Sequence, residues 1–278
     1  MNRQVNPNVL NIAHRGARSV APENTLAAAR KALEIGADMW ELDVCMSVDG
    51  VPYLAHDDTL TRTSNVTEIF PNRHPWASHA FTWEEIQQLD FGSWFNRQDP
   101  LGQIAIGNVS EAEQVSFIGD PAPSLEQALR FTRDNDWRVN IEIKDLSGTS
   151  GDATVVEEVV SLIEALGMEE LVLISSFNHP YLKRARAANP TIPTAALVNR
   201  PASDPTALVK QLGAQAYNPG LVAIRPSQIP AIRDADIDVY VWTVNDEATM
   251  HTLIQHHVSG IITDFPQRLK RVLNSRVA

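Results

Sequence analysis

Short apolar runs rich in β-branched residues alternate with amphipathic helical segments along most of the chain. Each run has the length and composition of a buried strand, and the segments between them carry apolar residues at helical spacing. The predicted strands are 9–13, 39–46, 139–143, 171–174, 194–198, 214–217, 239–244 and 260–263. The predicted helices are 24–35, 153–166, 180–188, 205–212, 226–235, 246–256 and 266–274. Asn24 is the expected N-cap of the first helix, and Gly36 is expected to end it.

This regular alternation predicts parallel strands of the α/β class, joined by helical crossovers. Eight strand–helix units favour closure into a (β/α)8 TIM barrel, the alternative being an open doubly wound sheet. No GxGxxG motif follows the first strand, which removes the usual dinucleotide-binding argument for the open sheet. A length of 278 residues fits one barrel domain over residues 1–278.

Residues 57–122 interrupt the alternation. The segment is irregular, contains several prolines and three tryptophans, and has one convincing helix at 83–89. It is too long for a bare loop in a compact domain, so we expect an insertion after the second strand. Loops that follow barrel strands line the active-site face, so this insertion is placed to form one wall of the substrate pocket. The alternative is an excursion that does not touch the substrate.

Composition excludes several other classes of protein. The chain is 44% hydrophobic and 21% charged, which excludes collagen, coiled coils and wholesale disorder. The net charge of −11 argues against a nucleic-acid partner, although local cations or a metal can still admit a small anionic substrate. The single cysteine, Cys45, excludes an internal disulfide. Without a long apolar span, or a signal-peptide core at residues 1–8, we expect a cytoplasmic protein with no stable membrane insertion.

Charged residues lie near the carboxyl ends of the predicted strands, where active sites of such barrels are found. Glu41 and Asp43 are two residues apart and share one face of their strand, as do Glu142 and Lys144 of the next. Three carboxylates and a lysine facing the interior of a barrel are costly unless a cation, one another or an anionic ligand neutralises them. A divalent ion that prefers oxygen ligands, Mg²⁺ or Ca²⁺, would satisfy all three acids. The alternative is a salt bridge between Lys144 and one carboxylate, which leaves two acids unpaired.

A predicted hairpin brings a histidine to these acids. The Asp-Gly pair at 49–50 lies between two β-like runs, which is the strongest short-range hairpin pattern. If these two residues form the loop, Val48 faces Val51 and His56 lies directly opposite Asp43. Cross-strand Cβ atoms are about 5 Å apart, so His56 would lie beside the proposed metal ligands.

The end of the first strand places an imidazole and a guanidinium side by side, at His14 and Arg15. Arginine offers a planar fork of donors that matches phosphate oxygens. Gly16 lets the backbone turn sharply or come close to a ligand. Taken alone, the tripeptide is a weak indication of function.

A series of short motifs follows from about Asn11 to Pro266. They are His14-Arg15-Gly16, Pro22-Glu23-Asn24-Thr25, Glu41-Leu42-Asp43-Val44, His56-Asp57, Asp58-Thr59-Leu60-Thr61-Arg62-Thr63, Phe91-Gly92-Ser93-Trp94-Phe95, Pro123-Ser124-Leu125-Glu126, Asn140-Ile141-Glu142-Ile143-Lys144, Ser175-Ser176-Phe177, Val241-Trp242-Thr243-Val244-Asn245 and Gly260-Ile261-Ile262-Thr263-Asp264-Phe265-Pro266. Each is modest in specificity, but the ordered set resembles the glycerophosphodiester phosphodiesterase family and covers nearly the whole chain.

The resemblance implies a TIM barrel with an insertion after the second strand, and metal-dependent hydrolysis of glycerophosphodiesters to an alcohol and sn-glycerol 3-phosphate. By position, it implies an acid/base pair at His14 and His56, metal ligands at Glu41, Asp43 and Glu142, phosphate contacts from Arg15 and Lys144, and a pocket lined by Phe177 and Trp242. For the two aromatic residues, ordinary barrel packing is the alternative. Residues 103–119 match no family pattern, which leaves the preferred leaving alcohol open.

Two other functions remain as alternatives at this point. A phospholipase D-type hydrolysis of lysophospholipids would use the same site and need an apolar surface around the barrel mouth. A non-catalytic barrel that binds a sugar phosphate or a metal would keep the scaffold alone, and the retention of every acid, base and ligand position argues against it. The nucleophile is either water or the neighbouring glycerol hydroxyl, and the resemblance favours the hydroxyl route through a cyclic phosphate. The oligomeric state is not predicted.

Overall fold

Eight parallel strands close into a barrel in the computed structural model, which describes residues 9–275. Their order around the barrel is β1-β9-β8-β7-β6-β5-β4-β2, and the pairing of β1 with β2 closes the ring. The barrel strands are β1 (Leu10–Ala13), β2 (Met39–Met46), β4 (Arg138–Ile143), β5 (Val172–Ser176), β6 (Thr194–Val198), β7 (Ala216–Pro219), β8 (Asp238–Val241) and β9 (Gly260–Thr263). Closure confirms the predicted TIM barrel and excludes the open sheet. The expectation about residues 1–8 concerns a part of the chain outside the described residues.

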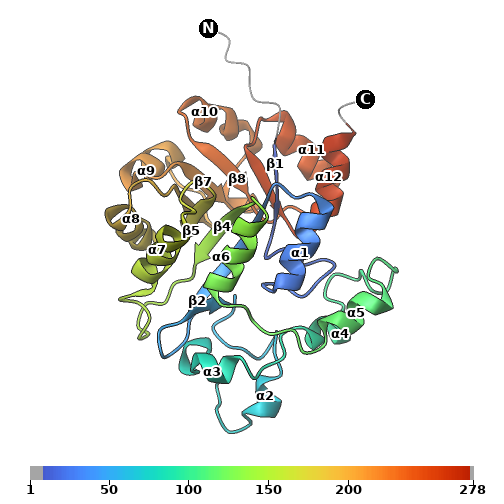
Figure 1. Ribbon diagram of the computed structural model, residues 1–278. Coiled ribbons are helices and arrows are strands. Elements are labelled where there is room, and N and C mark those ends of the chain that lie inside the picture. Colours follow the sequence, from blue (N-terminus) through green and yellow to red (C-terminus); the bar gives the residue numbers. More distant parts are fainter. Residues whose placement is uncertain (1–8, 276–278) are drawn as a thin grey trace.

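Helices surround the barrel (Figure 1). They are α1 (Leu26–Ile35), α6 (Leu125–Asp134), α7 (Val155–Leu166), α8 (His179–Ala188), α9 (Pro205–Leu212), α10 (Ile229–Asp234), α11 (Glu247–Gln255) and α12 (Pro266–Asn274), with short 3₁₀ turns η2 (Leu221–Ala223) and η3 (Pro226–Gln228) before α10. The predicted strands and helices differ from these at their ends by at most three residues. The predicted set lacks α6, which begins after Ser124 and is stabilised by a capping box between Ser124 and Gln127.

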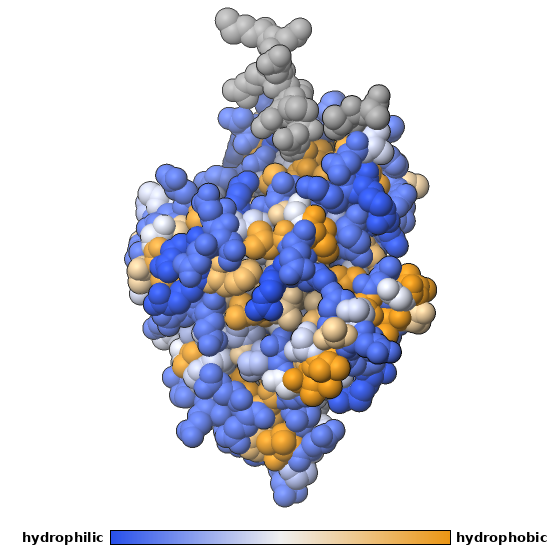
Figure 2. Space-filling model, turned by 45° about the vertical axis from the view of Figure 1, so that its right-hand side comes forward, coloured by the Kyte–Doolittle hydropathy of each residue, from blue (hydrophilic) through white to orange (hydrophobic). Residues whose placement is uncertain are grey.

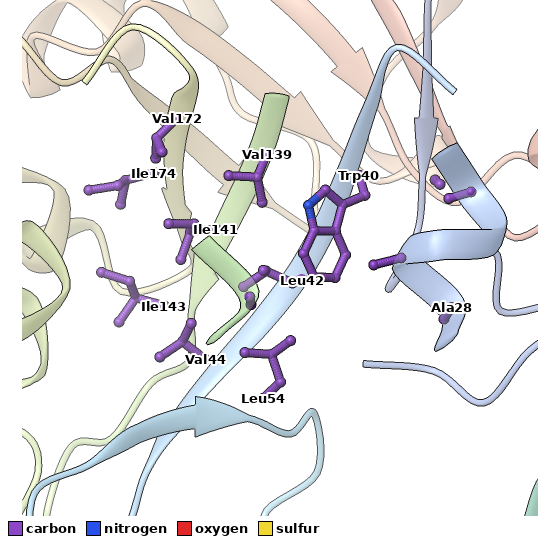
Figure 3. Packing of buried hydrophobic residues seen from close by; sticks show 14 of the residues in the cluster. Ala28, Trp40, Leu42, Val44, Leu54, Val139, Ile141, Ile143, Val172 and Ile174 are labelled. Carbon is purple, nitrogen blue, oxygen red and sulfur yellow. The ribbon is translucent and has the colours of Figure 1, made fainter. Parts of the chain in front are cut away.

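Alternate residues of the strands pack into two different hydrophobic layers. Figure 3 shows Trp40, Leu42 and Val44 of β2 beside Val139, Ile141 and Ile143 of β4, all within the large core cluster. The other cluster comprises Ile12, Met39, Leu173, Ala195, Ala216, Tyr240 and Ile262. Since side chains alternate along a strand, Glu41 and Asp43 share the face of Met39 and project into the barrel interior.

The turn after β1 packs tightly against α1. Gly16 has a φ of +79°, and a Cβ there would lie 2.7 Å from the carbonyl carbon of Ala28. Arg15, with a φ of 54°, is also left-handed, and its backbone N–H donates to Glu41 Oε2 at 2.9 Å. The sharp turn expected at Gly16 is therefore confirmed, and it places the backbone of Arg15 against a carboxylate.

The N-cap of α1 is Thr25, and the prediction of Asn24 for this role is wrong. Thr25 Oγ1 accepts from the N–H of Ala28 at 3.2 Å, and α1 ends at Gly36 as predicted. The side chain of Asn24 turns instead to Asp43, where its Nδ2 donates to Oδ2 at 2.9 Å and its Oδ1 accepts from the backbone N–H at 3.1 Å. Asn24 therefore does not cap the helix, and its side chain holds the buried carboxylate of Asp43 instead.

The predicted hairpin forms between β2 and β3 (Pro52–Leu54), but its loop has three residues, 48–50. The N–H of Ser47 donates to the carbonyl of Val51 at 3.0 Å, and Ser47 Oγ accepts from the N–H of Val51 at 2.9 Å. Gly50 has a φ of +86°, the left-handed conformation that a three-residue hairpin loop needs. The serine hydroxyl thus favours a longer loop than the Asp-Gly pair alone indicates.

The longer loop shifts the register by one residue. Val44 pairs with Leu54, and the N–H of Ala55 donates to the carbonyl of Asp43 at 3.2 Å. Ala55 therefore lies opposite Asp43, and the prediction that His56 does so is wrong. His56 nevertheless reaches the cavity described below, because the chain leaves the strand after Leu54.

Residues 57–122 contain more structure than their irregular pattern indicates. They include α2 (Val66–Ile69), η1 (Ser78–Ala80), α3 (Trp83–Ile86), α4 (Ser93–Gln98) and α5 (Glu111–Phe117). The predicted helix 83–89 is the short α3, and the others were not predicted because they have too few turns to show helical periodicity. Figure 1 shows α2 and α3 at the lower end of the view and α4 and α5 at its right-hand side.

The surface is mixed in character. Figure 2 shows hydrophilic residues over most of one face, with hydrophobic residues in small patches between them. In the part of the chain that the structure describes, no helix is both long enough and apolar enough to cross a bilayer.

Candidate active site

A cavity of about 180 Å³ opens at the carboxyl ends of the barrel strands. Its lining comprises His14, Arg15, Glu41, His56, Asn140, Glu142, Lys144, Ser175, Phe177, Leu197, Trp242, Thr243 and Ile262. The cavity therefore brings together every predicted site residue except Asp43, which lies behind it in contact with Arg15 and Lys144. A larger, open hollow at Asp136, Glu169 and Glu170 has no histidine, lysine or arginine among its described lining residues.

Three carboxylates form a compact acidic group beside the cavity. Asp43 pairs with Glu142 across β2 and β4, and Glu41 lies two residues from Asp43 on the same face. One oxygen of each lies within 4.8 Å of the others, and all three residues are buried. Hard divalent cations take carboxylate oxygens as ligands, so the donor set fits Mg²⁺ or Ca²⁺.

The electrostatics of this group also favour a bound cation. Burial, followed by repulsion from Asp43, raises the pKa values of both Glu41 and Glu142. Burial acts in the same direction on Asp43, but Arg15 and Lys144 outweigh it and lower the pKa to about 2. Among the described residues, Glu41 forms no ion pair and accepts only the backbone N–H of Arg15. Negative charge therefore exceeds the positive charge available to balance it.

The two predicted phosphate-binding cations hold these carboxylates. Arg15 Nε lies 3.1 Å from Asp43 Oδ2, and Lys144 Nζ lies 2.7 Å from Glu142 Oε1 and 3.5 Å from Asp43 Oδ1. The salt bridge considered as an alternative for Lys144 thus exists, yet it leaves Glu41 without a cationic partner. Since both cations line the cavity, they are also accessible to an anion inside it.

His14 is oriented by a buried aspartate from the far end of the chain. Its Nδ1 lies 2.6 Å from Asp264 Oδ1, and Asp264 also accepts from Arg18 NH1 at 3.1 Å and Asn245 Nδ2 at 2.7 Å. Burial and, after it, the positive charge of Arg15 lower the pKa of His14 below 6.5. The imidazole is therefore neutral at pH 7, with Nδ1 occupied and Nε2 left to meet a group in the cavity.

His56 has a matching arrangement with its sequence neighbour. Its Nδ1 lies 2.6 Å from Asp57 Oδ1, while Arg62 Nε donates to Asp57 Oδ2 at 2.6 Å. Burial opposes ionisation of Asp57, but the hydrogen bonds from His56 and Arg62 hold its pKa below the usual range. The side chain of His56 is 32% exposed and that of His14 is 13% exposed, so His56 is the imidazole nearer to solvent.

Glu23 connects the surroundings of both histidines. Its carboxylate accepts from Arg15 NH1 at 2.8 Å, Arg18 NH2 at 2.9 Å and Arg62 NH2 at 2.7 Å, and its side chain is 2% exposed. We call these four residues the Glu23 cluster. Burial disfavours the charge on Glu23, but Arg15 and the hydrogen bonds from Arg62 hold its pKa well below 4.5.

Replacing Glu23 with glutamine is expected to destabilise the protein by about 3–5 kcal/mol at pH 7, because three cations then lack their buried counter-ion. A carboxylate with a lowered pKa stabilises the fold above its unfolded-state pKa, so this difference from wild type is largest at neutral pH. It should shrink as the pH falls below 4.5, where Glu23 takes up a proton in the unfolded chain, and vanish once the pH falls below the lowered pKa of the folded state. Chemical denaturation at pH 7 and pH 3 measures both values.

The exposed ion pair between Glu126 and Arg130 of α6 provides the matched control. Glu126→Gln should change stability by no more than about 0.5 kcal/mol at either pH. An equal loss in the Glu23 and Glu126 variants would contradict the assigned role of the buried cluster.

Phe177 and Trp242 form one side of the cavity. Their ring centroids are 5.6 Å apart with planes at 83°, and Trp242 Nε1 donates to the carbonyl of Asn218 at 2.9 Å. Both residues also line the cavity, so packing and substrate contact are compatible roles. Their contact with substrate stays a prediction.

Residues 57–122 supply none of the described lining residues, so the expected pocket wall is not found. The segment contacts the site residues instead, because Asp57 hydrogen-bonds His56 and Arg62 hydrogen-bonds both Asp57 and Glu23. These residues were quoted within motifs, as were Glu23 and Asp264, but no role was predicted for any of them. Nearness in sequence to His14 or His56 is an indication for Glu23, Asp57 and Arg62, whereas Asp264 lies 250 residues from His14 and has none.

The fold and the site together define a class of protein, a (β/α)8-barrel enzyme acting on an anionic substrate. One cavity combines two aspartate-held imidazoles, two cations and a carboxylate group able to hold a divalent ion. Such groups suit phosphate-ester chemistry, in which protons move and negative charge builds on oxygen.

Comparison with known proteins identifies the family. The model of the glycerophosphoryl diester phosphodiesterase family matches residues 14–268. A curated glycerophosphodiester phosphodiesterase from Caldanaerobacter subterraneus subsp. tengcongensis is 32% identical over 258 residues, which cover 93% of this chain and 95% of that protein. The chain therefore belongs to the glycerophosphoryl diester phosphodiesterase family, and it is a phosphoric diester hydrolase.

Solved structures agree with this assignment. One from Silicibacter pomeroyi superposes with a TM-score of 0.83 at 26% identity, covering 98% of this chain and 95% of that chain. A phosphodiesterase from Oleispira antarctica, solved in complex with the product sn-glycerol 3-phosphate, has a TM-score of 0.77 at 26% identity, covering 95% of this chain and 96% of that chain.

Proposed function

We propose that this enzyme hydrolyses glycerophosphodiesters to an alcohol and sn-glycerol 3-phosphate, with His14 and His56 as its acid/base pair. The observation that carries the proposal is the convergence of two imidazoles, each held at Nδ1 by an aspartate, on one cavity. The product bound to the Oleispira antarctica neighbour supports the substrate class. We assign residues 1–278 to one catalytic domain, with 57–122 as its insertion.

His14 is proposed as the general base. Its lowered pKa leaves the ring neutral at pH 7, and the contact of Nδ1 with Asp264 leaves Nε2 to take the proton of the nucleophile. Asp264 then stabilises the imidazolium that forms, as an aspartate does beside a catalytic histidine. In the favoured cyclic route the neighbouring glycerol hydroxyl attacks the phosphorus and the alcohol leaves, and water then opens the cyclic phosphate to give sn-glycerol 3-phosphate. In the direct route water is the nucleophile.

His56 is proposed as the general acid that protonates the departing alkoxide. Its more exposed side chain suits contact with a leaving alcohol that extends towards solvent. Because one imidazole must be neutral while the other is charged, the pH–rate profile should be bell-shaped.

The phosphoryl oxygens are proposed to contact Arg15 and Lys144, which line the cavity and carry the positive charge that those oxygens need. A divalent ion, Mg²⁺ or Ca²⁺, would be held by Glu41, Asp43 and Glu142. When bound, such an ion supplies Lewis-acid stabilisation of phosphoryl oxygens. Phe177 and Trp242 are proposed to contact the glycerol end of the substrate.

A product assay tests this function. The enzyme is incubated with a divalent ion and, in turn, with glycerophosphocholine, glycerophosphoethanolamine and glycerophosphoinositol. Release of sn-glycerol 3-phosphate is monitored by ³¹P NMR, and the free alcohol is assayed separately. We expect turnover of at least one, with a transient cyclic phosphate if the glycerol hydroxyl attacks. Binding of sn-glycerol 3-phosphate without turnover of any substrate would favour the non-catalytic barrel.

The lysophospholipid alternative has one observation in its favour. Two apolar side chains are exposed in loops that follow barrel strands, Phe177 after β5 at 38% and Val222 after β7 at 84%. The same assay should therefore include lysophosphatidylcholine below its micellar concentration. We expect a higher kcat/KM for glycerophosphocholine, and a clear preference for the lysophospholipid would replace the main proposal.

A further inference from the structure

We infer that Glu23 is a positioning residue for both imidazoles at once. From His14 the contacts run through Asp264 at 2.6 Å to Arg18 at 3.1 Å, and from Arg18 to Glu23 at 2.9 Å. From Glu23 they continue through Arg62 at 2.7 Å and Asp57 at 2.6 Å to His56 at 2.6 Å. The inference rests on the proposed acid/base function of these two histidines.

The geometry of Glu23 sets it apart from an ordinary salt-bridge partner. Oε1 accepts from Arg15 and Arg62, and Oε2 accepts from Arg18 and, at 3.1 Å, from a second nitrogen of Arg62. Each guanidinium that meets this carboxylate also meets a second carboxylate at the site: Asp43 for Arg15, Asp264 for Arg18 and Asp57 for Arg62. A shift of Glu23 would therefore be transmitted to the acidic group and to both histidines.

The connected groups come from separate parts of the chain. Arg18 and Glu23 lie in the loop after β1, Asp264 follows β9, and Arg62 belongs to the segment 57–122 that begins beside His56. No backbone hydrogen bond of a common strand fixes His56 against His14, since β3 has already ended at Leu54. The buried carboxylate supplies the fixed point that joins the loop carrying His56 to the barrel.

The test uses Arg62→Gln, because Arg62 is the partly exposed member of the cluster and its loss leaves Glu23 paired with two other arginines. We expect kcat to fall by about 10²-fold, the cost of a misplacement of about 1 Å. KM should change by less than about threefold, because Arg62 does not line the cavity and its loss removes no direct contact with the substrate. Activity is measured with saturating divalent ion and well below the melting temperature, and the folded fraction is checked by circular dichroism.

Glu23→Gln and Glu23→Asp extend the test. Glutamine should lower kcat by at least the same factor, and aspartate, which keeps the charge one methylene further back, should recover part of that loss. The matched control is Glu113→Gln, since Glu113 of α5 also ties the segment 57–122 to the barrel helices through Lys31 of α1 but touches no site residue. Its kcat should equal that of wild type.

Three results separate the outcomes. If folded Arg62→Gln and Glu23→Gln both keep the kcat of wild type, the inference is overturned and the cluster serves stability alone. If Glu113→Gln loses kcat as Arg62→Gln does, general loosening of the segment explains the loss, and the inference also fails. If His14→Ala and His56→Ala are fully active, the proposed acid/base function fails, whatever the Arg62 variant does.

Discussion

Replacing either His14 or His56 with alanine is expected to lower kcat by about 10²–10⁴-fold while the barrel stays folded. Both imidazoles line the cavity. Among the described residues, the side chain of His14 hydrogen-bonds only Asp264, and that of His56 only Asp57. Alanine removes the proton acceptor or donor but leaves the acidic group and the cations in place. Steady-state kinetics on glycerophosphocholine, with circular dichroism as the folding check, measures the effect.

A substrate with a better leaving group separates the two roles. The p-nitrophenyl ester of glycerol phosphate needs little protonation of its leaving group, so the loss in His56→Ala should be much smaller on this substrate. The loss in His14→Ala should persist, since the nucleophile still requires a base. The opposite pattern would exchange the two assignments, and activity near that of wild type in either variant would remove that histidine from the mechanism. His179, the first residue of α8, whose Nε2 lies 3.1 Å from the carbonyl oxygen of Leu197 in β6, provides a control substitution.

Removing divalent ions with a chelator is expected to lower activity by about 10³-fold or more, since Lewis-acid stabilisation of the transition state is worth several kcal/mol. Activity should return on addition of Mg²⁺ or Ca²⁺, and the ion that restores it at the lower concentration identifies the better fit. Full activity after dialysis against chelator would contradict the metal assignment.

A binding measurement checks the same site without relying on turnover. A ligand at 100 times its dissociation constant stabilises the folded state by about 2.7 kcal/mol, so the ion should raise the melting temperature of wild type. Asp43→Asn combined with Glu142→Gln should abolish that rise. An unchanged rise in the double variant would place the ion elsewhere in the protein.

The barrel and the acidic group could be predicted because both follow from short-range periodicity. A spacing of two residues puts Glu41 and Asp43 on one face, and it does the same for Glu142 and Lys144, whatever the rest of the chain does. The order of strands and helices then brings β2 and β4 together, since their connection is a crossover in a parallel barrel. The structure brings these four residues together as that reasoning requires.

The partners of the site residues could not be predicted in the same way. Asp264 contacts His14 across 250 residues of sequence, and that choice depends on closure of the barrel between β9 and β1. The side chain of Asn24 had two local options, capping a helix or bonding Asp43, and packing of the loop after β1 selected the second. The hairpin register changed because Ser47 Oγ bonds Val51, a contact that the Asp-Gly pair does not reveal.

The apolar layer of Ile12, Met39 and Tyr240 inside the barrel limits how substrate can enter and how products can leave. These side chains fill the barrel interior next to Glu41, so the cavity opens only at the carboxyl ends of the strands. Substrate and both products share that one opening. A molecule bound at that opening would therefore block both the entry of substrate and the release of products.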